Sequence, residues 1–84
     1  MNKIYTNDLN TISVPAEKVK SFETVKHFLN FYKLSMHFDY VSFDDSEYDI
    51  VIGCHLDLSP SNDPTFEFCF SCDETISLYF REAI

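Results

Sequence analysis

The second half of the chain alternates between apolar and polar positions. From residue 48 to residue 58 every even position is apolar, and the same parity returns at residues 66–72 and 76–80. Because successive side chains of a strand point to opposite faces, a period of two is typical of a half-buried strand. The pattern predicts three strands whose even positions face a core and whose odd positions face solvent.

A fourth strand is predicted from Met36 to Tyr40. Its apolar parity shifts at Val41 and Phe43, and a β-bulge near Val41 would account for that shift. Two further segments, residues 3–6 and 11–14, are candidates for short extended pieces.

The connections between these strands are constrained by parity. If Cys72 and Ile76 both point inward, they oppose each other and leave a three-residue turn at 73–75. The same reasoning lets Leu58 face Phe66 across the preceding connection.

The first half of the chain holds the predicted helix, from Phe22 to Leu34. Apolar residues recur there at steps of three and four: Phe22, Val25, Leu29, Tyr32 and Met36. Ser21 is a candidate N-cap, and an earlier start with Pro15 near the first turn is the alternative. Together these elements predict a single α+β domain over residues 1–84. The expected fold is a four-stranded antiparallel β-meander with one amphipathic helix packed on one face. A short N-terminal strand could add to this sheet.

Charge divides the chain unevenly. The formal net charge is −8, from fourteen acidic and six basic residues. Residues 1–33 carry five lysines against three acids, a net +2, whereas residues 34–84 carry Arg81 against eleven acids, a net −10. Such a field repels nucleic acid and anionic membranes and attracts basic protein surfaces. Solubility alone is the competing explanation.

The acidic residues of the predicted sheet are the main candidates for partner binding. Asp45, Glu47 and Asp49 share odd parity. If this segment is extended, their side chains project to one side at intervals of about 7 Å, and such an array could imitate a row of phosphates. Pairing Leu58 with Phe66 would also set Asp57 opposite Glu67, and like charges directly opposite each other destabilise a sheet. Retaining them suggests that the charge has a use. The predicted partner-binding residues are Asp39, Asp44, Asp45, Glu47, Asp49, Asp57, Glu67 and Tyr79.

Tyr79 is included because an aromatic side chain rimmed by acids is typical of the centre of a protein interface. Phe43, Val51 and His55 are expected on the same outward side. The alternative, left open, is that these side chains cover a second small core under the N-terminal segment.

Metal, cofactor and catalytic sites are not predicted. Cys54-His55 and Cys69-x-x-Cys72 offer soft ligands, but neighbouring strand residues diverge, and the chain has one glycine with which to build a turn. Asp57 with Glu67 could act as a magnesium or acid–base pair, although nothing indicates a pocket beside them. Direct nucleic-acid binding by the scattered lysines is disfavoured by the net charge.

The segment Met1 to Asn10 has no apolar signal region, and no stretch approaches the roughly 20 apolar residues of a membrane span. The three cysteines are expected to be reduced thiols in a cytoplasmic protein.

The leading hypothesis is a small acidic inhibitor that occludes a basic, nucleic-acid-binding surface of an enzyme or complex. In size, charge and architecture the chain is similar to two groups of small inhibitors: phage anti-CRISPR and anti-restriction proteins, and immunity proteins of nuclease toxins. The second hypothesis is a homodimer or a small subunit of a larger complex, assembled through the edge of the strand at residues 76–84. A small enzyme or metal protein is the third.

Overall fold

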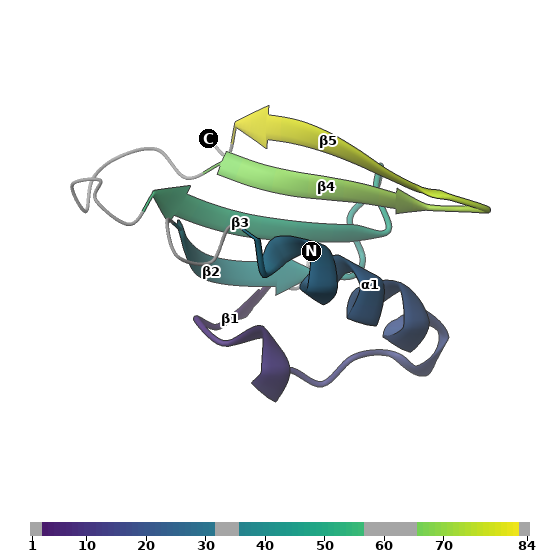
Figure 1. Cartoon of the computed structure of the whole chain (residues 1–84), viewed down its shortest axis with the longest axis horizontal. Coiled ribbons are helices and arrows are strands. Elements are labelled where there is room, and N and C mark those ends of the chain that lie inside the picture. The colour runs from purple at the N-terminus through teal and green to yellow at the C-terminus, as the bar shows by residue number, and fades with distance from the viewer. Residues whose placement is uncertain (1–2, 32–35, 57–65, 83–84) are drawn as a thin grey trace.

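The computed structural model describes residues 3–31, 36–56 and 66–82, which form a five-stranded antiparallel sheet with one helix against it (Figure 1). In chain order the elements are β1 (Lys3–Tyr5), the short 3-10 helices η1 (Leu9–Thr11) and η2 (Ala16–Lys18), α1 (Val19–Leu29), β2 (Met36–Ser42), β3 (Ile50–Leu56), β4 (Phe66–Cys72) and β5 (Ile76–Glu82). The strand order is β1-β2-β3-β4-β5. The predicted α+β class is confirmed, but the sheet has five strands rather than four because β1 pairs with β2.

The helix begins earlier than the apolar repeat predicts. η2 leads directly into α1 at Val19, and the Pro15 carbonyl accepts a hydrogen bond from the Lys18 amide at 2.9 Å. Ser21 therefore lies inside the helix, and its prediction as N-cap is wrong. The helix also ends earlier than predicted, at Leu29, and a turn follows at residues 30–31, so the expected continuation to Leu34 is wrong.

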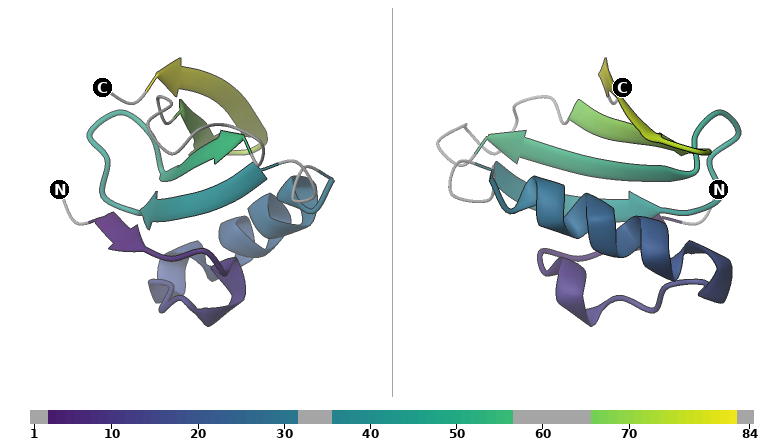
Figure 2. Two further views of the ribbon diagram at one scale, coloured as in Figure 1. Left: turned by 90° about the vertical axis from the view of Figure 1, so that its left-hand side faces the viewer. Right: turned by 45° about the vertical axis from the view of Figure 1, so that its right-hand side comes forward.

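α1 packs along one face of the sheet, which we call the inner face (Figure 2). Its buried stripe comprises three of the five predicted residues, Phe22, Val25 and Leu29. Met36, also predicted on this stripe, is instead the first residue of β2, and Tyr32 lies outside the described residues. Phe28 packs edge-on against Phe70 of β4, with ring centroids 6.2 Å apart. Burying each large side chain contributes about 1.5–3 kcal/mol, so this layer supplies much of the stability of a small sheet.

The predicted parity is confirmed for the inner face of β3 and β4. Their even positions join the helix stripe in one buried cluster, which includes Ile50, Ile52, Cys54, Phe68 and Phe70. The predicted three-residue turn is also confirmed, because Cys72 opposes Ile76.

A bulge in β2 moves its apolar side chains between faces. Phe38 opposes Cys54 and Tyr40 opposes Gly53, so Asp39 is the extra residue. The expected bulge is thus present, two residues before Val41. It turns Tyr40 to the outer face and Val41 to the inner core, where Val41 is fully buried.

The register between β3 and β4 differs from the predicted one by four residues. Cys54, rather than Leu58, opposes Phe66, and Glu67 therefore opposes Gly53. The predicted like-charge pair of Asp57 with Glu67 is wrong, and Asp57 itself lies outside the described residues. Parity allowed this error because a shift by an even number leaves every side chain on its predicted face.

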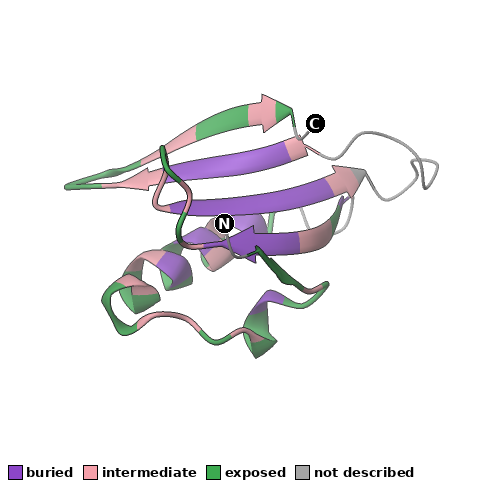
Figure 3. Cartoon of the chain, turned by 180° about the vertical axis from the view of Figure 1, so that it is seen from behind, coloured by how far each residue is buried: buried purple, intermediate pink, exposed green. Residues whose placement is uncertain are grey.

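The outer face of the sheet is largely buried as well, contrary to the prediction of a solvated odd face. Figure 3 shows β3 and β4 buried over most of their length when the sheet is seen from this side. Ser42, Val51, Glu67 and Cys69 are all buried. Part of the cover comes from Asp45 and Tyr48, in the connection from β2 to β3, which contact Arg81 and Tyr79 on this face.

α1 spans 11 residues, about half of the length that is needed to cross a bilayer. No helix in the described segments is both long enough and apolar enough to span a membrane.

Candidate functional site

The outer face carries a cluster of ionic and aromatic side chains centred on Arg81. The Arg81 guanidinium donates from Nε to Glu67 Oε1 at 2.8 Å and from Nη2 to Asp45 Oδ1 at 3.1 Å. The Tyr40 hydroxyl donates to Glu67 Oε2. Both acceptor side chains are almost completely buried, at 5% exposed for Asp45 and 6% for Glu67. We call the set the outer cluster; it comprises Tyr40, Asp45, Tyr48, Glu67, Tyr79 and Arg81.

Asp45 joins the connection between β2 and β3 to the far strand. Its Oδ2 accepts the backbone N–H groups of Glu47 at 3.0 Å and Tyr48 at 3.2 Å, which closes a local turn. Its Oδ1 accepts from Arg81, 36 residues away in the chain. Tyr48 then stacks on Tyr79, with ring centroids 5.5 Å apart. One carboxylate therefore both shapes the loop and holds it over the sheet.

The charges of the outer cluster stabilise one another. Burial raises the pKa of Asp45, but the two amides and the Arg81 guanidinium outweigh burial, so the net pKa lies below its usual value. Hydrogen bonds to Asp45 and Glu67 raise the pKa of Arg81. Burial and the hydrogen bond to Glu67 raise the pKa of Tyr40, which keeps its hydroxyl a donor. Every buried side-chain nitrogen and oxygen of the described residues has a partner, as is typical of a structural network.

Gly53 makes room for this arrangement. The Tyr40 ring lies against the Gly53 backbone, where a Cβ atom would overlap ring carbons. Tyr5 packs edge-on against the same ring at 5.7 Å, and the Lys3 amine lies 4.3 Å from its centroid. A second small core thus exists on the outer face, where Tyr5 and Lys3 of the N-terminal strand contact Tyr40, and Asp45 and Tyr48 of the following connection contact Arg81 and Tyr79.

Most of the carboxylates predicted to bind a partner are bonded within the protein. Besides Asp45 and Glu67 in the outer cluster, Asp39 lies 2.9 Å from Nδ1 of His55. Asp49 accepts the backbone N–H of Cys72 at 2.7 Å. The expectation that Asp45, Glu47 and Asp49 project to one side is wrong because these residues form a loop rather than a strand.

Three other predicted residues that the structure describes are exposed or half-exposed. Asp44 is exposed and accepts from the Ser42 hydroxyl at 3.0 Å, Glu47 is exposed, and Tyr79 is 49% exposed. Phe43 was expected on the outward side, but it packs edge-on against Phe22 of α1 at 5.4 Å.

The antiparallel topology gathers exposed acids at one end of the sheet. Because neighbouring strands run in opposite directions, the connection from β2 to β3 and the turn from β4 to β5 lie at the same end (Figure 1). We call the four exposed carboxylates there the acidic end; they are Asp44, Glu47, Asp73 and Glu74.

Sequence reasoning omitted Asp73 and Glu74. The signal that could have found them was the predicted turn at 73–75, since a meander places alternate connections together.

Three lysines also lie toward this end, and two of them are held by other groups. The Lys18 amine donates to the carbonyl oxygens of Phe43 at 2.7 Å and Asp49 at 2.9 Å. Lys3 lies over the Tyr40 ring, and Lys20 is exposed on the first turn of α1. The four exposed carboxylates of the acidic end outnumber these three lysines, and neither Lys18 nor Lys3 is shown paired with one of the four.

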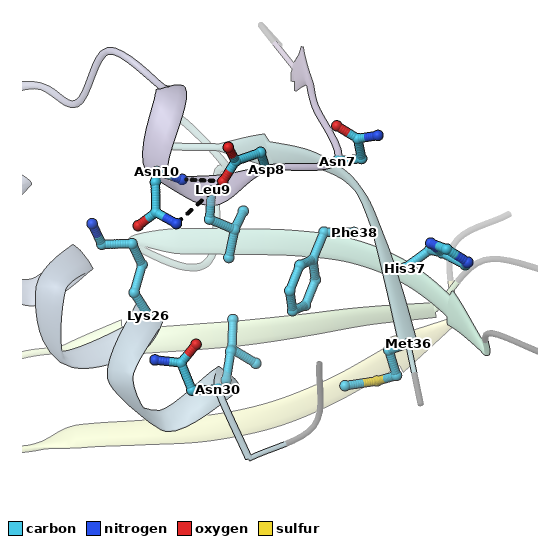
Figure 4. A pocket seen from close by; sticks show the side chains of 10 residues that line it. Asn7, Asp8, Leu9, Asn10, Lys26, Asn30, Met36, His37 and Phe38 are labelled. Atoms are coloured by element: carbon cyan, nitrogen blue, oxygen red, sulfur yellow. Dashed lines mark hydrogen bonds between the residues drawn. The ribbon is translucent and has the colours of Figure 1, made fainter. Parts of the chain in front are cut away.

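A cavity of about 350 Å³ lies at the opposite end of the sheet, between residues 7–10, the last turns of α1 and the start of β2 (Figure 4). Leu9, Leu29 and Phe38 line it with apolar groups, while Asn10, Lys26 and other polar side chains form its rim. The Asp8 carboxylate fixes the rim by accepting from the Asn10 amide and side chain at 3.0 and 3.2 Å. Such a lining suits a small molecule with both apolar and polar groups.

The thiols of Cys54 and Cys69 are free and buried. Burial raises the pKa of Cys54 to about 12 and that of Cys69 to about 11. The two thiols belong to opposite faces of the sheet. Within residues 3–31, 36–56 and 66–82, no three His, Cys, Asp or Glu side chains gather in a way that could hold a metal ion.

Comparison of the chain with protein-family models, with curated proteins and with solved structures found no match.

Proposed function

We propose that the chain is a protein-binding inhibitor whose acidic end docks on a basic surface of a nucleic-acid-binding protein and occludes it. The observation that carries this proposal is the contrast between two sets of acids. Asp39, Asp45, Asp49 and Glu67 are only partly exposed or buried, and each is bonded to a group elsewhere in the chain. Asp44, Glu47, Asp73 and Glu74 are exposed at one end of the sheet, where Asp44 also accepts from the neighbouring Ser42 hydroxyl.

The net charge of the whole chain also favours binding to a basic partner. A net charge of −8 on 84 residues sets up a long-range field that draws basic surfaces in. Steering of this kind raises association rates by about 10- to 1,000-fold at low salt. The rigid sheet and the Asp45 turn hold Glu47 in place before contact, which reduces the ordering cost of binding.

In this proposal the chain acts in the same way as anti-CRISPR, anti-restriction or nuclease-immunity inhibitors. Such a protein needs no catalytic group, because it acts by covering the surface that would otherwise hold phosphates. Carboxylates on loops at the end of a sheet can enter a groove or cleft on the target. The flat array of carboxylates that parity predicted would fit such a concave surface less well.

Competition for the target is the direct test. The immobilised chain is used to capture proteins from cells that produce it, and the captured protein is then purified and loaded with a labelled DNA or RNA duplex. One equivalent of the chain is expected to release the duplex. The proposal fails if the captured protein is acidic, or if it keeps its nucleic acid when saturated with the chain.

A further inference from the structure

We propose that the free edge of β5 binds an extended segment of the basic partner as a sixth strand. The inference rests on the proposed function and names how the partner is held once charge has brought it close. Main-chain hydrogen bonds would supply the affinity, and side chains on β5 would select the segment.

β5 has the properties of an accepting edge. It pairs with β4 over all seven of its residues, from Ile76 to Glu82, with no break in register. Among the described residues it has no strand on its other side. The opposite edge, β1, has three residues and begins with Lys3, and short strands and lysines are common protections against unwanted pairing. β5 lacks both protections.

Two aromatic side chains on β5 are exposed, and each is held in position by a contact with a neighbouring ring. Phe80 is 67% exposed and packs against Phe68 of β4, with ring centroids 5.0 Å apart. Tyr79 is held on the other face by Tyr48. A strand added beside β5 would cover the exposed parts of both rings, which is how an aromatic anchor gains area on binding.

A shallow apolar groove runs beside β5 on the inner face. It has a volume of about 200 Å³ and lies between α1 and the start of β5, where Phe28, Ile76 and Leu78 line it. An apolar side chain from an added strand could enter this groove, since alternate residues of that strand would point toward α1.

Charge selects the occupant. Asp73 and Glu74 precede β5 and Glu82 ends it, while Arg81 is bonded to Glu67 and Asp45. In an antiparallel pair of two β5 strands centred on Leu78, Glu74 of each copy would lie opposite Glu82 of the other, which is repulsive. A segment with an apolar centre and Lys or Arg at both ends fits the edge and its flanks.

A designed peptide tests this inference with the full chain. The probe is a capped nine-residue peptide with alternating valine and threonine in its centre and two lysines at each end. A second peptide replaces the lysines by glutamates. NMR titration and amide hydrogen exchange are followed for every residue, and binding is expected to slow exchange in Ile76–Glu82 at least fivefold. The glutamate peptide is expected to bind at least tenfold more weakly.

Phe80→Thr and Tyr5→Thr are the matched variants, since each removes an exposed aromatic ring from an edge strand. Phe80→Thr is expected to weaken binding of the lysine peptide at least fivefold, and Tyr5→Thr less than twofold. Binding that leaves exchange in β5 unchanged and maps only to the acidic end would overturn strand addition while leaving the proposed function intact. Protection of β5 without peptide, together with a doubled mass in sedimentation, would show that a second copy occupies the edge and would also overturn the inference.

Discussion

Glu67 of β4 and Arg81 of β5 lie directly opposite each other and are joined by a 2.8 Å hydrogen bond on the outer face of the sheet. Alternation along β4 places Glu67 on the outer side, as expected, but the pairing with Arg81 makes it an internal group. Asp45 completes the arrangement from a loop that closes over both. The acids of the sequence therefore divide into a buried, hydrogen-bonded set and an exposed set.

Arg81→Met should strongly destabilise the protein. It leaves the carboxylates of Asp45 and Glu67 buried without a cation, and breaking such a network typically costs several kcal/mol. Because Arg81 itself is about one-third exposed, we expect about 2–3 kcal/mol in the free energy of unfolding measured with urea. Lys26→Met, which breaks the pair with the 66% exposed carboxylate of Glu23, should cost less than about 0.5 kcal/mol. Equal losses in the two variants would contradict a stabilising cluster.

Asp45 should contribute to the loss of stability in acid. Its pKa in the folded protein is lowered, so its contribution is present above the unfolded value of about 3.9 and is lost as the pH falls through the folded value. Asp45→Asn keeps an oxygen for the amides of Glu47 and Tyr48 but removes the charge. The stability difference between wild type and Asp45→Asn should therefore shrink between about pH 5 and pH 2. Parallel curves over that range would show that Arg81 does not stabilise this carboxylate.

Gly53→Ala should displace the Tyr40 ring. The added Cβ overlaps ring carbons, and overpacking of this kind costs about 1–3 kcal/mol. If that overlap is the cause, the substitution should be much less costly in a Tyr40→Ala background, with a coupling of at least about 1 kcal/mol between the two sites. Additive effects would place the cause elsewhere.

The thiols of Cys54 and Cys69 should be slow to react. Burial raises their pKa values to about 12 and about 11, whereas an unfolded thiol has a pKa of about 8.5. At pH 8 a Cys72→Ser variant should react with an aromatic disulfide reagent at least about 100-fold more slowly when folded than in urea. Comparable rates in the two states would mean that these side chains are accessible.

Strand alternation and turn parity were strong enough to predict the inner face of β3 and β4, but not that of β5, where Phe80 is 67% exposed. Ile50, Ile52 and Phe68 reach the core as expected, and Cys72 opposes Ile76 because both must point the same way. These inferences succeed because each depends on neighbours in sequence.

The outer half depended on contacts that no local pattern encodes. The link between Asp45 and Arg81 spans 36 residues and requires a loop to fold over the sheet. The register that sets Glu67 against Gly53 is one of several that parity allows equally. The meander predicted the strand order that brings the β2–β3 connection and the β4–β5 turn to the same end. Asp73 and Glu74 could therefore have been assigned to the acidic end from the sequence, but they were not.

The most direct measurement of the central claim is the association rate of the chain with its captured basic partner as a function of salt. Glu47→Gln/Glu74→Gln removes two charges from the acidic end. Asp8→Asn/Glu23→Gln removes two charges elsewhere and leaves Asp8 an oxygen for the Asn10 amide, so the two double variants have the same net charge.

We expect the first variant to associate about three- to tenfold more slowly than wild type near 50 mM salt, with the difference fading near 0.5 M, and the second to stay within about twofold. Equal slowing of both variants would show that only net charge matters, and unchanged rates in both would remove charge steering altogether.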